Sequence, residues 1–352
     1  MRRSVQCMLV AAGLAASGAV SAQTNAPAIP YEAEDALSGF PNDIHLGEAA
    51  GVARNSRGEI FVYTRTGNPT LSLGTSRYMS HSGSRVFKFD SRGRYEREIG
   101  QEIYGALFAQ QARVDRDDNV WIVDRMSGQV IKFTPEGRIS MVLSRKPEAM
   151  QLPVTPPGAG RGGRGGRGPT QGESFRNPTD IAWDSRGNIY VTAGIGGSRI
   201  AKYDPEGRFL ANFGGDGDMP GQFDGIHGIA IDAEDNLYVA DYGNERIQVL
   251  DSNGNFRREM SGFGAPMAIC ITPSPNSMLY VSNSNPPDNI DIDGEIYEVR
   301  LDGTITGRFG RAGKLIGEFG TVNSLDCKVP NDLLVGETGN WRVQRVRLRP
   351  TQ

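Results

Sequence analysis

Three polar residues far apart in this sequence carry side chains that could together hold a ligand or a divalent metal: Gln110, His227 and Asn323. A neutral imidazole such as that of His227 binds zinc well and can exchange protons. The carboxamide oxygens of glutamine and asparagine are weak, hard ligands that suit calcium or magnesium better. His227 is therefore the candidate metal ligand, and all three are candidate ligand-binding residues if the fold brings them together.

Two arginines and a tyrosine stand at the ends of apolar runs, where no turn requires them. Arg65 ends IFVYTR, Arg125 follows VWIVD, and Tyr242 follows LYVAD. A guanidinium group binds carboxylates, whereas a phenol transfers protons only if its pKa falls well below its ordinary value of about 10. Arg65 and Tyr242 are therefore candidate catalytic groups, and Arg65 and Arg125 are candidate ligand-binding groups.

All of these residues lie in a repeat that recurs along the chain. The clearest copy covers residues 226–260; other copies begin at Gly51, Gln111, Pro178, Met267 and Asn323. Each copy alternates short apolar runs rich in Val, Ile, Tyr and Phe with Asp, Asn and Gly turns, which predicts antiparallel strands. A single four-stranded meander cannot bury its faces alone. Radial stacking of such sheets buries them, which predicts a β-propeller.

One anchor residue in each copy gives the number of blades: Ile60, Val120, Ile189, Leu237, Leu279 and Leu333. The sequence thus predicts an all-β fold, a six-bladed β-propeller of four-stranded repeats over residues 47–352. The last copy ends without an evident fourth strand. We expect the N-terminal segment, residues 23–46, to supply that strand after Pro30 and to close the ring.

Alignment of the first run of each copy places one residue per blade at the mouth of the central channel: Ala50, Gln110, Thr179, His227, Met267 and Asn323. Gln110, His227 and Asn323 fall on alternate blades, so approximate six-fold symmetry would aim them at one another. Together with Thr179 they form the main candidate ligand site. The alternative, that His227 only packs and forms hydrogen bonds within its blade, stays open.

Other conspicuous residues have simpler structural interpretations. Asp124 and Asp241 end strands and are expected to accept backbone N–H bonds in turns. Trp121 and Trp183 occupy strand positions and are expected to pack between blades. The acidic run 285–293 lacks the ligand spacing of a calcium-binding loop, so a solvated hairpin loop is expected there.

The N-terminus has the features of a secretory signal. Residues 1–22 combine two early arginines, an apolar run from Met8 to Val20 and a small-residue cleavage site. That run is too short to span a bilayer comfortably, and no later segment resembles a membrane helix. The protein is therefore expected to be periplasmic or secreted, with no membrane insertion.

Cysteine content and charge limit the partners. Removal of the signal leaves Cys270 and Cys327, in the first strands of adjacent blades. An exported protein permits a disulfide, but the pattern favours two buried free thiols.

A formal charge of −3 argues against nucleic acid as a partner. The Gly-, Arg- and Pro-rich insertion at 153–172 is expected to be a flexible loop, and the protein a monomer.

Residues 213–256 resemble the NHL repeat, through the F-G…G-x-F lead-in and the I-A-I-D, N-L-Y-V-A-D and N-E-R-I-Q-V-L strands. The resemblance extends over essentially the whole mature chain and implies a six-bladed propeller. Within that family, the order of blades looks most like the peptidyl-α-hydroxyglycine α-amidating lyases. Those enzymes complete peptide C-terminal amidation by cleaving a C–N bond.

The lyase resemblance implies a zinc site of three histidines on alternate blades, of which this chain keeps only His227. Gln110 and Asn323 stand at the other two positions. Arg65 matches the arginine of the first blade, but Ile195 replaces the catalytic tyrosine and Tyr242 replaces the second arginine. These departures remove most of the family's catalytic groups.

Two functions follow from these residues. The first is an exported propeller that binds a peptide, glycan or protein partner at the channel mouth, with no resident cofactor. The alternative is an enzyme of the amidating-lyase type that cleaves a C–N bond with a bound divalent metal, zinc or calcium. The residues favour the first, because propellers host many functions and the zinc ligands are missing.

Overall fold

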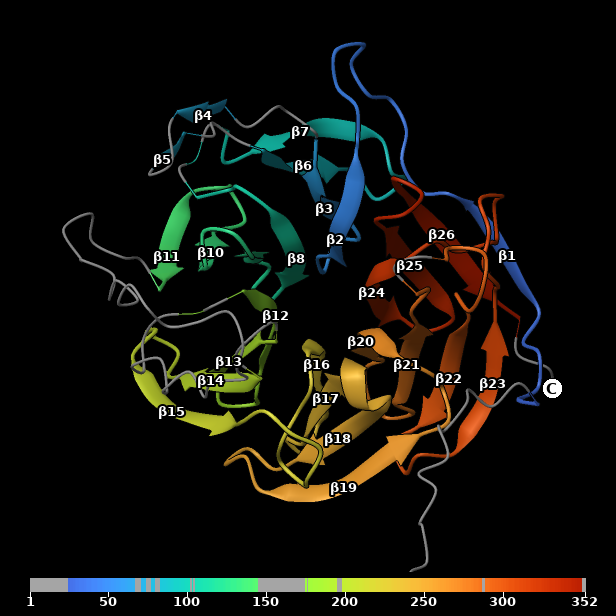
Figure 1. Cartoon of the computed structure of the whole chain (residues 1–352). Coiled ribbons are helices and arrows are strands. Elements are labelled where there is room, and N and C mark those ends of the chain that lie inside the picture. The colour runs from blue at the N-terminus through green and yellow to red at the C-terminus, as the bar shows by residue number, and fades with distance from the viewer. Residues whose placement is uncertain are drawn as a thin grey trace, which may run out of the picture.

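The computed structural model describes residues 25–66, 71–73, 77–79, 83–101, 103, 105–144, 175, 177–194, 198–286 and 289–349. These residues form six four-stranded antiparallel sheets arranged around a central channel (Figure 1). The predicted fold class, a six-bladed β-propeller, is therefore confirmed.

Each blade is a meander whose first strand is the innermost, and the sixth blade takes its outer strand from the N-terminal segment. Blade 1 contains β2 (Glu48–Arg54), β3 (Ile60–Arg65), β6 (Ser84–Phe89) and β7 (Tyr95–Ile99). Blade 2 contains β8 (Ala109–Val114), β9 (Val120–Asp124), β10 (Gln129–Phe133) and β11 (Ile139–Leu143). Blade 3 contains β12 (Pro178–Trp183), β13 (Ile189–Ala193), β14 (Arg199–Tyr203) and β15 (Phe209–Gly214).

Blade 4 contains β16 (Ile226–Ile231), β17 (Leu237–Asp241), β18 (Arg246–Leu250) and β19 (Phe256–Ser261). Blade 5 contains β20 (Pro266–Ile271), β21 (Met278–Asn283), β22 (Ile296–Arg300) and β23 (Ile305–Phe309). Blade 6 contains β24 (Val322–Val329), β25 (Asp332–Glu337), β26 (Arg342–Leu348) and β1 (Tyr31–Asp35). A short 3₁₀ helix, η1 (Tyr242–Asn244), follows β17, and a two-stranded hairpin, β4 (Leu71–Leu73) with β5 (Arg77–Met79), interrupts blade 1.

The hydrophobic core lies between the blades rather than within them. Six clusters of buried residues each join two adjacent sheets, from Tyr63 with Ile122 between blades 1 and 2 round to Leu334 with Val62 between blades 6 and 1. Buried aromatic and β-branched side chains supply most of this contact, as the alternating sequence pattern requires. No blade buries its faces alone, so the ring folds as one unit.

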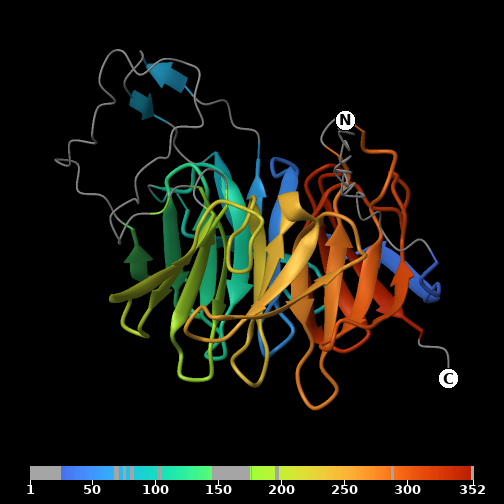
Figure 2. The same cartoon turned by 60° about the horizontal axis from the view of Figure 1, so that its bottom comes forward.

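The two ends of the channel differ. Inner strands begin at one end, called here the mouth, and the β4–β5 hairpin stands off the disc on this side (Figure 2). The tight turns between inner and second strands lie at the other end, called here the turn face. Those turns share one hydrogen-bond pattern. Asp115, Asp184 and Asp232 each accept hydrogen bonds from the backbone N–H groups of the residues two and four positions later.

The N-terminal segment supplies the strand that the last repeat lacks. β1 pairs antiparallel with β26, from Tyr31 opposite Leu348 to Asp35 opposite Gln344. The Tyr31 hydroxyl also donates to the Gly317 carbonyl at 2.6 Å. Segments from the two ends of the sequence therefore share blade 6, and the pairing satisfies the backbone groups of β26 that would otherwise form an open edge.

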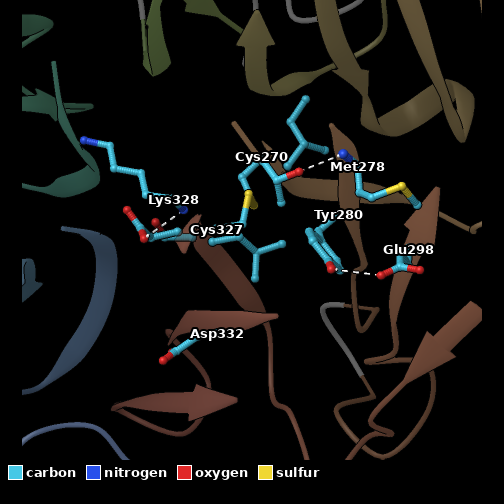
Figure 3. Close-up of a disulfide and its surroundings, with 12 residues drawn as sticks. Cys270, Met278, Tyr280, Glu298, Cys327, Lys328 and Asp332 are labelled. Carbon is cyan, nitrogen blue, oxygen red and sulfur yellow. Dashed lines mark hydrogen bonds between the residues drawn. A yellow bond between two sulfur atoms is a disulfide. The ribbon is translucent and has the colours of Figure 1, made fainter. Parts of the chain in front are cut away.

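Cys270 and Cys327 form a disulfide, with their Cα atoms 6.1 Å apart (Figure 3). The expectation of two free thiols was therefore wrong. The cysteines lie on β20 and β24, which are neighbouring inner strands. Packing around the channel brings these strands together at the same height, a relation that linear spacing does not reveal. The disulfide joins blade 5 to blade 6, the blade that segments from the two ends of the chain complete.

No helix in the ranges given above is long and apolar enough to cross a membrane. The expected signal at residues 1–22, the insertion at 153–172 and Ile195 lie outside the described residues.

Candidate functional site

All six inner strands carry an irregularity of register at the same place near the mouth. The pairing skips between Ala49/Gly51, Ala109/Gln111, Pro178/Asp180, Ile226/Ile229, Pro266/Ile269 and Val322/Ser324. The six predicted channel-mouth residues, Ala50 to Asn323, lie in these bulges. A bulge changes the direction of a side chain and is common at the rims of closed sheets. The six positions are thus structurally equivalent.

Of the two carboxamides at these positions, that of Asn323 forms hydrogen bonds that hold the fold together. Asn323 Nδ2 donates to the carbonyl oxygens of Ala50 at 2.6 Å and Gln110 at 2.8 Å, which joins blades 6, 1 and 2. Gln110 is buried, and its Oε1 has no hydrogen-bond partner among the described residues. Thr179 is also buried, with its hydroxyl 2.8 Å from that of Thr192. Asn323 and Thr179 therefore already use polar atoms within the protein.

The predicted arginines lie together around Phe108, in the segment that leads into β8. The guanidinium carbon of Arg65 is 3.8 Å from the Phe108 ring centroid, and that of Arg125 is 5.9 Å from it. Arg65 is also held by Glu48 at 2.6 Å and by the carbonyl of Ala109 at 2.8 Å. By contrast, the Arg125 guanidinium has neither a carboxylate nor a hydrogen-bond acceptor among the described residues.

Burial and the positive charge of Arg65 both lower the pKa of Arg125. Burial likewise lowers the pKa of Arg65, against the opposing effect of its hydrogen bond to Glu48. Two half-buried guanidinium groups that repel each other favour the binding of an anion between or beside them. Arg125 is the group with unused donors for that anion.

His227 lies beside Arg125 of this pair. Burial, and then the charge of Arg125, lower the pKa of His227 to about 4. Its ring centroid is 5.3 Å from that of Tyr242, the first residue of η1, with the planes tilted by 59°. The mouth thus places a neutral imidazole and a phenol next to an unpaired arginine.

Asp124 holds the Phe108 segment in place. Its Oδ2 accepts bonds from the Tyr63 hydroxyl at 2.7 Å and from the backbone N–H groups of Leu107 at 2.8 Å and Phe108 at 2.6 Å. Its Oδ1 accepts the N–H of Ser127 at 2.7 Å, so the predicted turn role is confirmed. Asp241 has the corresponding role in blade 4, accepting the N–H of Asp224 at 2.7 Å. The sequence pattern does not single out Phe108 or Tyr63, because Phe108 lies outside every strand and Tyr63 has the pattern of a buried core residue.

Below the mouth, charged side chains cross the channel. Arg113 of β8 forms a bidentate ion pair with Asp180 of β12, with N–O distances of 2.9 and 2.6 Å. The same guanidinium donates to the carbonyls of Leu325 and Ile269, on β24 and β20. Arg113 therefore ties four blades together across the axis, below the mouth.

The residues at the mouth do not fit the zinc site that the lyase resemblance implies. In the described part of the chain, no group of three or more His, Cys, Asp or Glu side chains could hold a metal ion. His227 would be the one imidazole of the set, and Asn323 already binds two carbonyls through its amide. Carboxamide oxygens are poor zinc ligands, so we derive no chemical step through a metal.

Comparison with known proteins supports the fold. Residues 223–250 match the NHL repeat. Over 326 residues the chain is 25% identical to peptidyl-alpha-hydroxyglycine alpha-amidating lyase 1 of Drosophila melanogaster, covering 85% of this chain and 55% of that protein. It is 28% identical over 241 residues to peptidyl-glycine alpha-amidating monooxygenase B of Xenopus laevis, covering 66% and 24%. The chain thus spans between about a quarter and about half of these relatives.

Solved structures show the same fold at low sequence identity. A gluconolactonase from Xanthomonas campestris superimposes with a TM-score of 0.59 over 97% of this chain and 100% of that one, at 14% identity. Virginiamycin B lyase from Staphylococcus aureus gives 0.53 over 92% and 89%, at 15% identity. These two likenesses concern the fold alone. From the repeat, the six sheets and the curated relatives together, the chain is a six-bladed β-propeller that contains an NHL repeat at residues 223–250 and is similar in sequence to peptidyl-α-hydroxyglycine α-amidating lyases.

Proposed function

We propose that this protein is an exported, monomeric binding propeller whose mouth takes a peptide through a free carboxylate. The observation that carries the proposal is the unpaired guanidinium of Arg125, half-buried beside Arg65 and His227. Guanidinium groups recognise carboxylates with two parallel hydrogen bonds, and a partly buried site strengthens the attraction. The names of the relatives add that peptidyl chains are their substrates, which selects a peptide over a glycan.

The neighbouring groups suit the rest of such a ligand. Phe108 offers an apolar ring face between the arginines, against which a small side chain or the α-carbon of the last residue could pack. His227 is neutral at neutral pH, so it can donate a hydrogen bond from one ring nitrogen and accept one at the other. It is therefore suited to orient a peptide amide next to the carboxylate.

A matched pair of ligands tests this proposal. A short peptide with a C-terminal glycine carboxylate and the same peptide as its C-terminal amide are titrated calorimetrically into the purified protein, in buffer with a metal chelator. We expect the carboxylate peptide to bind roughly tenfold tighter or more than the amide, because charged hydrogen bonds contribute about 1.5–3 kcal/mol. Equal affinities, or binding that needs added zinc, would refute the proposal.

The second candidate is C–N lyase activity, which the similarity to amidating lyases over most of the chain favours. A peptidyl α-hydroxyglycine would lose the proton of its hydroxyl, the C–N bond would break, and the amide nitrogen would take up a proton. The products would be a peptide amide and glyoxylate. Here Arg65 and Arg125 would hold the carboxylate, and the neutral His227 would accept the hydroxyl proton.

Product analysis separates the two candidates. Incubation with a peptide ending in α-hydroxyglycine should give glyoxylate no faster than the uncatalysed rate if the protein only binds. Turnover that exceeds this rate and is lost in a folded His227→Ala variant would instead establish the lyase.

Export is supported by the N-terminal features and by the Cys270–Cys327 disulfide, because disulfides persist in oxidising compartments. Fractionation of cells that express the full chain should place the processed protein, starting near Gln23, in the periplasm or medium. A full-length cytoplasmic product with reduced thiols would contradict this part of the proposal.

A further inference from the structure

A cavity opens at the turn face, away from the mouth. It has a volume of about 450 Å³ and lies among the turns of blades 2, 3 and 4, with Lys328 from blade 6. Its walls include the aromatic side chains Trp121 and Trp183, which come from β9 and β12. Nothing in the proposed peptide-binding mouth uses these residues.

Polar side chains separate this cavity from the mouth. Arg113 and Asp180 pair across the channel at 2.6 Å, above the cavity. Below them the Lys328 ammonium donates to the carbonyls of Arg54 and Val114, each at 2.9 Å. A ligand at the turn face would therefore bind independently of one at the mouth.

The two tryptophans are in contact but differ in their hydrogen bonding. Their ring centroids are 5.5 Å apart with the planes tilted by 54°. Trp121 Nε1 donates to Asp115 at 2.8 Å, whereas Trp183 Nε1 is buried and has no partner among the described residues. A buried indole N–H usually finds an acceptor, and an unsatisfied one costs about 1–3 kcal/mol. Trp183 therefore combines a partly exposed ring with an unused donor.

The polar side chains that line the cavity include both acidic and basic groups. Five aspartates and three cationic side chains line the cavity. Asp115 and Asp184 are fixed by turn hydrogen bonds, and Lys132 lies over the Trp121 ring at 5.1 Å. Fixed carboxylates accept bonds from hydroxyl groups, while lysine and arginine donate to them. A simple anion would be repelled by the aspartates, and a simple cation would be repelled by the lysines and the arginine. Neither kind of ion therefore suits this lining.

We propose that this turn-face cavity is a second ligand site, for a saccharide whose ring stacks on Trp183. A pyranose offers an apolar face of C–H groups for an aromatic ring and a rim of hydroxyls that both donate and accept. The cavity supplies both partners, and its volume falls within the range of small-molecule sites.

Tryptophan fluorescence tests the proposal directly. The chain has three tryptophans, and Trp341 is exposed on the mouth side, so Trp341→Phe leaves Trp121 and Trp183 as reporters at the cavity. This variant is titrated with glucose, galactose, mannose, N-acetylglucosamine and the β-linked disaccharides of glucose and N-acetylglucosamine. We expect a saturable spectral change with at least one sugar, at millimolar concentration or below.

Three variants in the same background show whether that change belongs to the cavity. Trp183→Phe should weaken sugar binding roughly tenfold, because it reduces the aromatic area on which the sugar ring stacks. Lys132→Gln, which leaves the blade core intact, should also weaken it. Arg125→Gln, in the mouth, should leave it unchanged. The proposal fails if no sugar gives a saturable change, if folded Trp183→Phe and Lys132→Gln both bind normally, or if Arg125→Gln abolishes the change.

Discussion

The hydroxyl of Tyr63 donates a 2.7 Å hydrogen bond to Asp124, and this bond joins the two blades that carry the mouth arginines. Arg65 follows Tyr63 by two residues on β3, and Arg125 follows Asp124 directly. The same carboxylate holds the backbone of Phe108, on whose ring both arginines rest. The distance between the two guanidinium groups therefore depends on the Tyr63–Asp124 hydrogen bond, which lies outside the proposed binding site.

Removal of that hydroxyl should affect binding as well as stability. Tyr63→Phe leaves a buried carboxylate with one bond fewer, and we expect the affinity for the glycine-carboxylate peptide to fall about threefold to tenfold. Tyr238→Phe is the matched control, because it removes a bond of 3.1 Å from a buried tyrosine to Asp232 at the turn face. Calorimetric titration should show weaker binding in the first variant only. An equal loss in both would mean that Tyr63 acts only through general stability.

The histidine at the mouth should make stability depend on pH. The pKa of His227 is about 4 in the folded protein, below its ordinary value of 6.5. Between these values the unfolded chain takes up a proton that the folded protein does not, so the free energy of unfolding should decrease as the pH falls from 6.5 to about 4. His227→Gln should flatten this part of the profile, measured by chemical denaturation at each pH. His45→Gln, at an exposed histidine, serves as the control, and an unchanged slope in His227→Gln would contradict the expectation.

The disulfide should stabilise the ring. Cys270 and Cys327 are 57 residues apart in sequence, so their bond removes considerable freedom from the unfolded chain. We expect a reductant, or the double substitution to alanine, to lower the free energy of unfolding by about 2–4 kcal/mol. Reductant should then have no further effect on the double variant. Free thiols in the oxidised wild-type protein, detected by mass after alkylation, would contradict the bond itself.

The closing strand offers a fourth test. Deletion of residues 31–46 removes β1 and leaves β26 with an unpaired edge. We expect a lower melting temperature and self-association that increases with concentration, because exposed strand edges pair with other chains. Glu34→Gln is the control: it removes only an exposed ion pair to Arg347, and such pairs contribute about 0–1 kcal/mol. Unchanged melting and a monomer after the deletion would show that β1 is dispensable.

Much of the architecture could be predicted because repetition makes each element visible several times. A short, mostly apolar run such as Leu237 to Asp241 indicates a buried second strand, and five other copies support that interpretation. The same repetition placed Gln110, His227 and Asn323 at equivalent positions, which the bulges confirm. The local sequence pattern is therefore sufficient to predict those features that every blade shares.

The contacts that build the site could not be predicted in the same way. The direction of the Asn323 amide, toward two carbonyls rather than a ligand, depends on how closely blades 1, 2 and 6 approach. Phe108 lies between strands, where alternation carries no signal. The disulfide depends on the relative height of two strands whose cysteines are far apart in sequence. All three are relations between blades, which a single repeat does not encode.

The central claim, that Arg125 receives the carboxylate of a peptide, is tested most directly by one comparison. The glycine-carboxylate peptide is titrated into wild-type protein, Arg125→Gln and Arg208→Gln, the last being a control at an exposed arginine in blade 3 that faces Asp204 at 3.6 Å. We predict that Arg125→Gln lowers the affinity about tenfold or more and abolishes the preference over the C-terminal amide, while Arg208→Gln binds like wild type. Full affinity and full carboxylate preference in a folded Arg125→Gln variant would contradict the account.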